Sequence, residues 1–179
     1  MSHDQGVSLE ELQAVKEGQT FDRKSGKVGP KKIGDLVIGF ANADGGRIVV
    51  GMEDGGTPSG FRYLPNGTSE IREVLTQWVS PPPKYSIQSK EFTHTNGISD
   101  ELLIIDVEQS TDVHKNAKDE VYVRIGSQNK LLNFEEREAL LSERGKRNFE
   151  VGTAEKVSIE DLDLELLENY GAMIGIKEP

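Results

Sequence analysis

Short apolar or alternating runs along the chain predict five β-strands. Residues 47–52 (RIVVGM) form a compact β-branched run, which is typical of a central strand buried on both faces. Two later runs flank the dipeptide Asn96-Gly97, which favours positive φ angles and therefore predicts a β-hairpin. The predicted strands are residues 20–24, 47–52, 85–92, 102–107 and 121–125.

Caps and helical spacing predict the helices. Ser8 with Glu11 three residues later forms a capping box that opens a first helix, and Gly18 is expected to end it. A second helix is predicted to begin at Pro30 and to stop at Gly45-Gly46. Two more helices are predicted: one capped by Thr68-Ser69 and ended by residues 81–83 (PPP), and one opened by Asn133 with Glu136 that runs to about Lys146.

The apolar faces of two helices predict the hydrophobic core. Apolar side chains return every three or four positions, so each helix presents one stripe to a sheet. The expected buried residues are Ile33, Leu36, Val37, Phe40 and Ala41 in the second helix, and Ile71, Val74, Leu75, Trp78 and Val79 in the third.

The order of these elements predicts an α/β (α+β) fold, a mixed β-sheet flanked by helices, over residues 8–148. The composition changes near Val151, because residues 151–179 carry seven acids against two bases, a net charge of −5. Ser158 is expected to cap a last helix that ends at Tyr170-Gly171. We therefore expect residues 149–179 to form an acidic helical linker toward a downstream module that lies outside this sequence.

The net charge of −10 argues against a surface that binds polyanions everywhere, because phosphate contacts need clustered Lys and Arg. Residues 16–32 differ from the rest, since they carry six bases against Glu17 and Asp22. The sequence has no cysteine, which excludes disulfides and thiolate metal sites. Its apolar runs are too short to cross a membrane, so we expect a cytoplasmic protein without membrane contact.

Three segments follow one another in the order and spacing of a known family. Residues 17–24 (EGQTFDRK), 40–55 (FANADGGRIVVGMEDG) and 122–127 (YVRIGS) resemble the opening motif, the double-glycine hallmark and the late strand-and-turn motif of the Schlafen AlbA-type domain. The resemblance covers about residues 10–146. It implies a DNA-binding or nucleic-acid-binding domain, as found at the N-terminus of bacterial proteins that resemble transcriptional regulators or RecG-related helicases.

Lysines around the start of the second helix are the first candidates for contact with nucleic acid. A helix N-terminus attracts phosphate through unpaired N–H groups and a partial positive charge, and neighbouring lysines strengthen this attraction. The amides of the double glycine can form an anion-binding nest, or the glycines and Asn42 can simply end the helix. Arg124 either joins this face or pairs with Glu120. The candidate binding residues are Lys24, Lys27, Lys31, Lys32, Asn42, Gly45, Gly46 and Arg124.

A trio of acids gives a competing hypothesis. In eukaryotic Schlafen relatives three acids serve an RNA-cleaving site, and the spacing of Glu17 and Asp22 matches the first pair. Asp54 or Glu53 is the candidate for the third. Clustered carboxylates bind Mg²⁺ or Mn²⁺ and orient water, so Glu17, Asp22 and Asp54 are the candidate catalytic and metal-binding residues, with Lys24 stabilising the developing anion.

The plain alternative is that Glu17 and Asp22 only pair with Lys16 and Lys24. Two departures from the family also bear on this site: Asp22 stands where the family has Glu, and Arg23 stands where it has Phe. The first shortens the reach of a carboxylate, and the second places a charge at an apolar position.

Other chemistry has little support in the sequence. The three histidines, His3, His94 and His114, lack the spacing of metal ligands, and residues 26–32 (GKVGPKK) lack the Gly-Lys-Ser/Thr ending of a phosphate loop. We therefore expect a non-catalytic nucleic-acid-binding module of a larger regulatory protein that requires no cofactor. A divalent-metal-dependent nuclease is the second hypothesis, and a protein interaction or assembly domain, such as a homo-oligomer, is the third.

Overall fold

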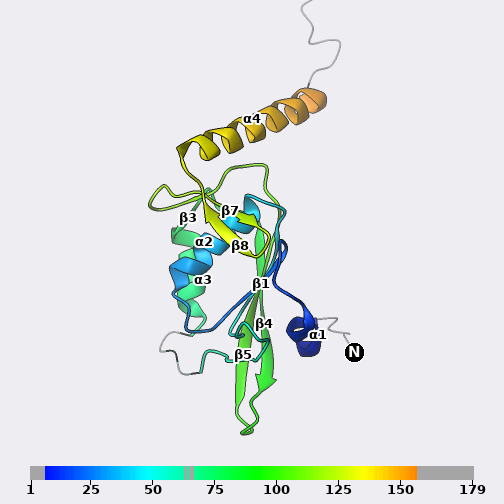
Figure 1. The fold of residues 1–179 in the computed structure, drawn as a ribbon, viewed down its shortest axis with the longest axis vertical. Coiled ribbons are helices and arrows are strands. Elements are labelled where there is room, and N and C mark those ends of the chain that lie inside the picture. Colours follow the sequence, from blue (N-terminus) through cyan, green and yellow to red (C-terminus); the bar gives the residue numbers. More distant parts are fainter. Residues whose placement is uncertain (1–6, 63, 65–66, 157–179) are drawn as a thin grey trace, which may run out of the picture. The chain divides into compact units, whose positions relative to one another are not determined.

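The computed structural model describes residues 7–62, 64 and 67–156 (Figure 1). The chain divides into two compact units, residues 1–141 and 142–179, and the sheet and its covering helices lie in the first. Within the described residues, none of the helices combines the length and the apolar character needed to cross a membrane.

The centre of the first unit is a four-stranded mixed sheet with the strand order β1-β2-β5-β4. β1 (Phe21–Lys24) runs parallel to β2 (Gly46–Val50), and β2 is antiparallel to β5 (Ser99–Val107). β4 (Tyr85–Thr93) and β5 form the predicted hairpin, in which Gly97 has a φ of +81°. The mixed sheet and the central, buried position of β2 are therefore confirmed.

Two helices cover one face of this sheet. α2 (Pro30–Ala41) begins with proline in its first turn, as predicted, and all five residues of its expected apolar stripe are buried. They pack with Ile48 and Ile105 of the sheet and with Ile71 and Leu75 of α3 (Ser69–Gln77). Val74 and Trp78 are only half-buried, because they lie nearer the edge of the α3 stripe.

The other face is covered by the short helix α1 (Leu9–Ala14), whose Leu12 packs on Phe21 and Val49. Both hydrogen bonds of the predicted capping box between Ser8 and Glu11 are present. The helix ends at Ala14, not at Gly18 as expected, because Val15 already has an extended backbone.

Two small sheets were not predicted. β3 (Val79–Ser80) pairs with β6 (Lys115–Asn116), and β7 (Tyr122–Ile125) pairs with β8 (Gln128–Leu131). β7 is the strand expected at residues 121–125, but it pairs outside the main sheet. Strands of two residues, or of mostly polar residues such as QNKL, carry no alternation that a sequence pattern can detect.

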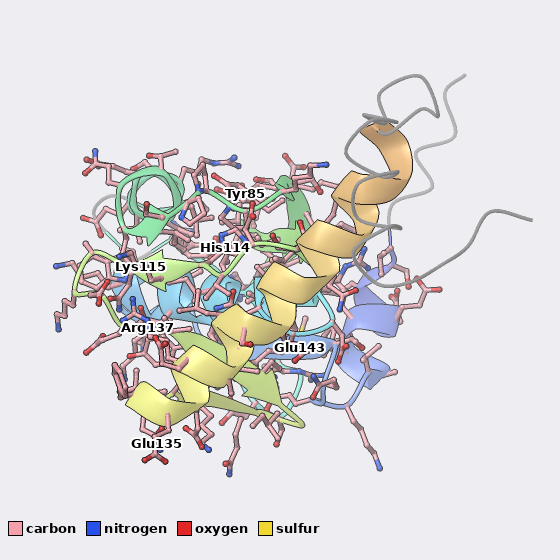
Figure 2. All side chains as sticks on the ribbon, turned by 90° about the horizontal axis from the view of Figure 1, so that it is seen from above. Tyr85, His114, Lys115, Glu135, Arg137 and Glu143 are labelled. Carbon is pink, nitrogen blue, oxygen red and sulfur yellow. The ribbon has the colours of Figure 1, made fainter. Side chains whose placement is uncertain are left out.

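α4 (Phe134–Lys156) opens with the predicted capping box, since the Glu136 amide donates to Asn133 Oδ1 over 2.9 Å. Its Arg137 and the Lys115 side chain of β6, both labelled in Figure 2, form ion pairs with Asp119 at 2.6 and 2.5 Å, respectively. The helix continues past Lys146, where we expected it to end. The predicted last helix lies outside the described residues, and the expected domain boundary stays a prediction.

Candidate nucleic-acid interface

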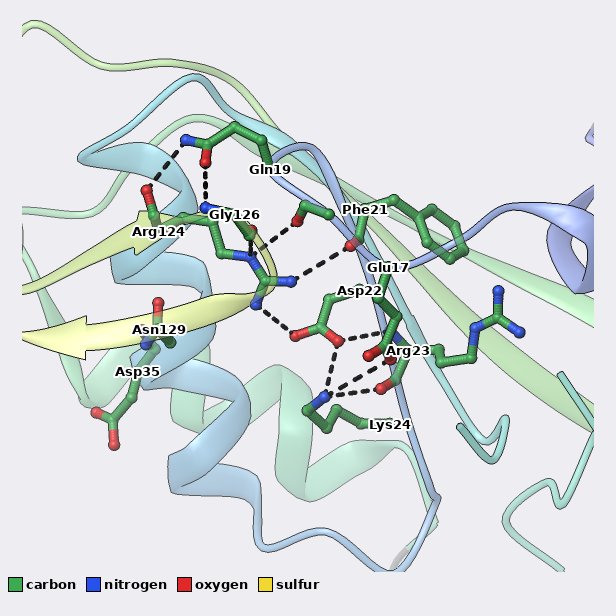
Figure 3. Close-up of polar contacts among 11 residues, drawn as sticks. Glu17, Gln19, Phe21, Asp22, Arg23, Lys24, Asp35, Arg124, Gly126 and Asn129 are labelled. Carbon is green, nitrogen blue, oxygen red and sulfur yellow. Dashed lines mark hydrogen bonds and ion pairs between the residues drawn. The ribbon is translucent and has the colours of Figure 1, made fainter. Parts of the chain in front are cut away.

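A buried ion pair joins two segments that lie a hundred residues apart in the sequence. Arg124 Nη1 on β7 donates to Asp22 Oδ2 on β1 over 2.8 Å, and each side chain is only 1% exposed (Figure 3). Burying either charge alone would be costly, so the two side chains compensate each other.

The remaining donors of Arg124 are also engaged inside the protein. Nε donates to the carbonyl oxygens of Gly18 and Gly126, at 3.1 and 2.9 Å, and the guanidinium lies 4.9 Å from the centre of the Phe40 ring. The expectation that Arg124 joins a binding face is therefore wrong, and its partner is Asp22 instead of Glu120.

Lys24 shares the second oxygen of Asp22. Its Nζ lies 2.7 Å from Asp22 Oδ1 and 4.0 Å from Glu17 Oε1, while the Glu17 carboxylate accepts from the backbone N–H of Arg23 (Figure 3). Burial and the neighbouring Asp22 raise the pKa of Glu17 above its usual value. Glu17 and Asp22 thus lie together, and Asp22 pairs with Lys24 as the plain alternative expected.

The structure does not assemble the proposed trio of acids. Asp54 is exposed on the turn after β2, and the described residues contain no group of three His, Cys, Asp or Glu side chains that could hold a metal ion. Glu53 is exposed beside Ser25, whose hydrogen bond lowers the pKa of the Glu53 carboxyl. No third acid of the described residues therefore joins Glu17 and Asp22.

Arg23 has a structural role that explains its charge at a normally apolar position. Its guanidinium donates to the carbonyl oxygens of Gln13 and Val15 at the C-terminal end of α1, and it lies 5.3 Å from the Phe21 ring. A cation at a helix C-terminus stabilises the unpaired carbonyls and the negative end of the helix dipole.

The double-glycine segment is also structural. The Gly45 amide donates to the Phe40 carbonyl over 2.9 Å, so this N–H is not open to an anion. Gly46 has a φ of +143°, and a Cβ there would lie 2.4 Å from the Thr20 carbonyl oxygen. The helix-stop interpretation of these glycines is therefore supported over the anion nest.

Asn42, which follows α2, is 2% exposed and ties the helix to the β6–β7 segment. Its Nδ2 donates to the carbonyls of His114 and Tyr122, at 2.8 and 2.9 Å, and its Oδ1 accepts from the His114 N–H over 2.8 Å. Its amide is committed to the fold, so the expectation that Asn42 binds nucleic acid is wrong for this structure.

Among the lysines predicted to bind nucleic acid, the three that are exposed lie in the first turn of α2 and in the loop before it. Lys27, Lys31 and Lys32 are all exposed. Lys31 Nζ lies 4.5 Å from the centre of the Trp78 ring, and Lys118, which the sequence analysis missed, lies 6.0 Å from the same ring. These four residues are hereafter called the α2 lysines.

A groove of about 360 Å³ opens next to the α2 lysines. Its apolar wall comes from Val28, Leu36 and Tyr122, and burial together with the nearby carboxylates raises the pKa of the Tyr122 hydroxyl to about 12. Sequence reasoning missed Tyr122 and Asn129, because this groove exists only where β7 and β8 pack on α2. The groove is lined by Lys24, Val28, Lys32, Asp35, Leu36, Tyr122 and Asn129.

A solved structure and a family model both agree with the observed fold. The DIP2311 protein from Corynebacterium diphtheriae superposes with a TM-score of 0.51 at 19% identity, over 70% of this chain and 29% of that protein. This likeness shows a shared fold, and the match spans less than a third of the larger protein. The search of curated proteins gave no match. The family model described as Schlafen, AlbA_2 matches residues 17–133, so this chain belongs to the Schlafen AlbA_2 family.

Proposed function

We propose that this domain binds nucleic acid through the α2 lysines and does so without cleaving it. The AlbA_2 family is consistent with a nucleic-acid-binding domain. The observation that carries the proposal is the exposure of Lys27, Lys31 and Lys32 on one loop and helix start, where none of them forms an ion pair with a described residue. A local cationic surface thus persists on a chain whose net charge is −10.

We expect the α2 lysines to bind nucleic acid through its phosphates. Each lysine that neutralises a phosphate releases counterions, which favours binding at low salt and weakens it as salt is added. The N-terminus of α2 adds a partial positive charge beside these lysines. Because contacts to phosphate carry no sequence information, the α2 lysines provide affinity and not sequence specificity.

The experiment measures the affinity of the full chain for fluorescent single-stranded and duplex oligonucleotides by anisotropy across a salt series. The double variant Lys31→Ala/Lys32→Ala is expected to bind at least about tenfold more weakly. For a single strand, losing two phosphate contacts lowers the salt slope by about 1.4. Absence of binding to DNA and RNA at low salt would instead favour a protein interaction or assembly domain.

Lys90→Ala is the matched control. Lys90 lies on β4 opposite Leu102, whose side chain packs on the α1 side of the sheet, so the substitution removes one positive charge far from α2. Its affinity and salt slope should equal those of the unmodified chain. Lys90→Ala removes one positive charge and the double variant removes two, so a loss of binding free energy about half that of the double variant would mean that only total charge matters.

The same titration separates binding from nuclease activity. RNA cleavage that requires Mn²⁺ and disappears in Asp22→Asn would establish the nuclease and overturn the non-catalytic role. We expect intact RNA, because Asp22 is buried against Arg124. The place of the domain in a larger regulator or a RecG-related protein is a proposal that follows from the family resemblance. Its cytoplasmic location is a proposal that follows from the composition of the sequence.

A further inference from the structure

We infer that the groove between α2, β1 and the β7–β8 hairpin receives one unpaired base, and that Lys24 and Lys32 hold the neighbouring phosphate. The preferred ligand is therefore a single strand. This inference rests on the proposed nucleic-acid binding and specifies its substrate class.

The volume and the apolar walls of the groove suit a nucleic-acid base. Its volume of about 360 Å³ lies at the lower end of the range for small-ligand sites, about 300–1,000 Å³. Val28 and Leu36 offer aliphatic contact, and Tyr122 offers an aromatic ring. Aromatic and apolar surfaces of this kind receive bases with little regard to their identity, since every base has a π-face.

The charges at the groove favour an anion attached to that base. Lys32 is exposed and forms no ion pair within the part of the chain that the structure describes. Lys24 pairs with Asp22 and lies 4.0 Å from Glu17 Oε1, but the charge of Asp22 is also compensated by Arg124 at 2.8 Å. The opposite charge in the lining, Asp35, has its Oδ1 engaged by Trp78.

The polar contacts of the walls keep the groove in shape before a ligand binds. Asn129 Nδ2 donates to the Asp35 carbonyl over 2.8 Å, which fastens β8 to α2. The Tyr122 hydroxyl donates to Glu120 over 3.2 Å, and its oxygen keeps a lone pair for a donor from the base. A preformed site of this kind loses little conformational entropy on binding.

A duplex cannot use the groove in the same way. Its bases are stacked and paired, so a base must first leave the stack at a cost in free energy. The α2 lysines alone would still contact duplex phosphates. Two modes of binding result. Single strands and duplexes both bind the α2 lysines through their phosphates, and a single strand also places a base in the groove without the cost of unpairing it.

The test compares two neighbouring lysines. Anisotropy titrations use the full chain, a labelled twelve-nucleotide oligothymidylate and a twelve-base-pair duplex at one salt concentration. We expect the single strand to bind at least about tenfold more tightly. Lys32→Ala, in the groove, should weaken single-strand binding more than duplex binding, whereas Lys31→Ala, beside Trp78, should weaken both equally.

A groove-filling variant completes the test. Val28→Trp adds bulk at a half-buried loop position without changing charge, and circular dichroism checks that it folds. It should remove the preference for the single strand while duplex affinity stays constant. Equal affinities for both polymers, together with equal losses in both lysine variants, would overturn the groove inference and leave the proposed function intact. Absence of binding to either polymer would defeat both.

Discussion

Two sets of basic side chains in this domain have opposite surroundings. Arg124 is enclosed, and its donors are engaged by Asp22 and by backbone carbonyls, whereas Lys27, Lys31 and Lys32 are exposed within ten residues of Asp22 in the sequence. The difference shows that positive charge serves the fold where it is buried and compensated. The exposed lysines stay in contact with solvent and are therefore accessible to a ligand.

Removing the buried cation should have the largest effect. Arg124→Met leaves the Asp22 carboxylate buried with one cationic partner fewer, and loss of one member of a buried pair costs about 3–5 kcal/mol. Urea unfolding followed by circular dichroism measures this free energy. Lys32→Met is the matched control on the surface and should change the stability by no more than about 0.5 kcal/mol.

A second variant sharpens the same comparison. Asp22→Asn/Arg124→Met removes both charges and should recover part of the stability that Arg124→Met loses. If the single substitution costs as little as the surface control, then the buried pair does not hold β7 to β1, and the contrast between the two sets fails.

The next effect in size concerns Asn42, the polar link at the end of α2. Asn42→Ala leaves the carbonyls and the amide of the β6–β7 segment without their partner, and an unsatisfied buried group costs about 1–3 kcal/mol. Asn96→Ala, at the exposed hairpin turn, is the control and should cost less. Equal unfolding midpoints for the two variants would contradict the structural role of Asn42.

The elements around α2 and β2 could be predicted because local pattern and tertiary burial agree there. The apolar stripe of α2, the β-branched run of β2 and the two capping boxes of α1 and α4 each depend on residues close in sequence. The Asn96-Gly97 turn likewise has its cause within four residues. These features need no knowledge of distant partners.

The candidate site was predicted less well, because it depends on contacts between distant segments. Arginine is usually a surface residue, and no local signal shows that Arg124 meets Asp22 across 102 positions. The groove is hidden for the same reason, since Lys32 and Tyr122 meet only in the folded chain. The lysine cluster of α2 was visible because its members are neighbours in sequence.

The smallest expected effect concerns Glu17, which lies beside Lys24 and accepts from the Arg23 N–H. Its pKa is raised, so the folded state binds the proton more readily than the unfolded state, and stability falls as the pH rises from about 4.5 through the folded pKa. Glu17→Gln should therefore raise the Tm by roughly 1–3 °C at pH 7 and leave it unchanged at pH 3.5. A lower Tm at pH 7 would mean that the charge of Glu17 is stabilising.

The most direct test of the central claim reverses charge on the exposed side of the comparison. The affinity of Lys31→Glu/Lys32→Glu for a single-stranded oligonucleotide is measured against that of Lys90→Glu across a salt series. The account predicts that binding is lost in the first variant and nearly retained in the second, with both proteins as stable as the unmodified chain. Equal affinities in the two variants would contradict it.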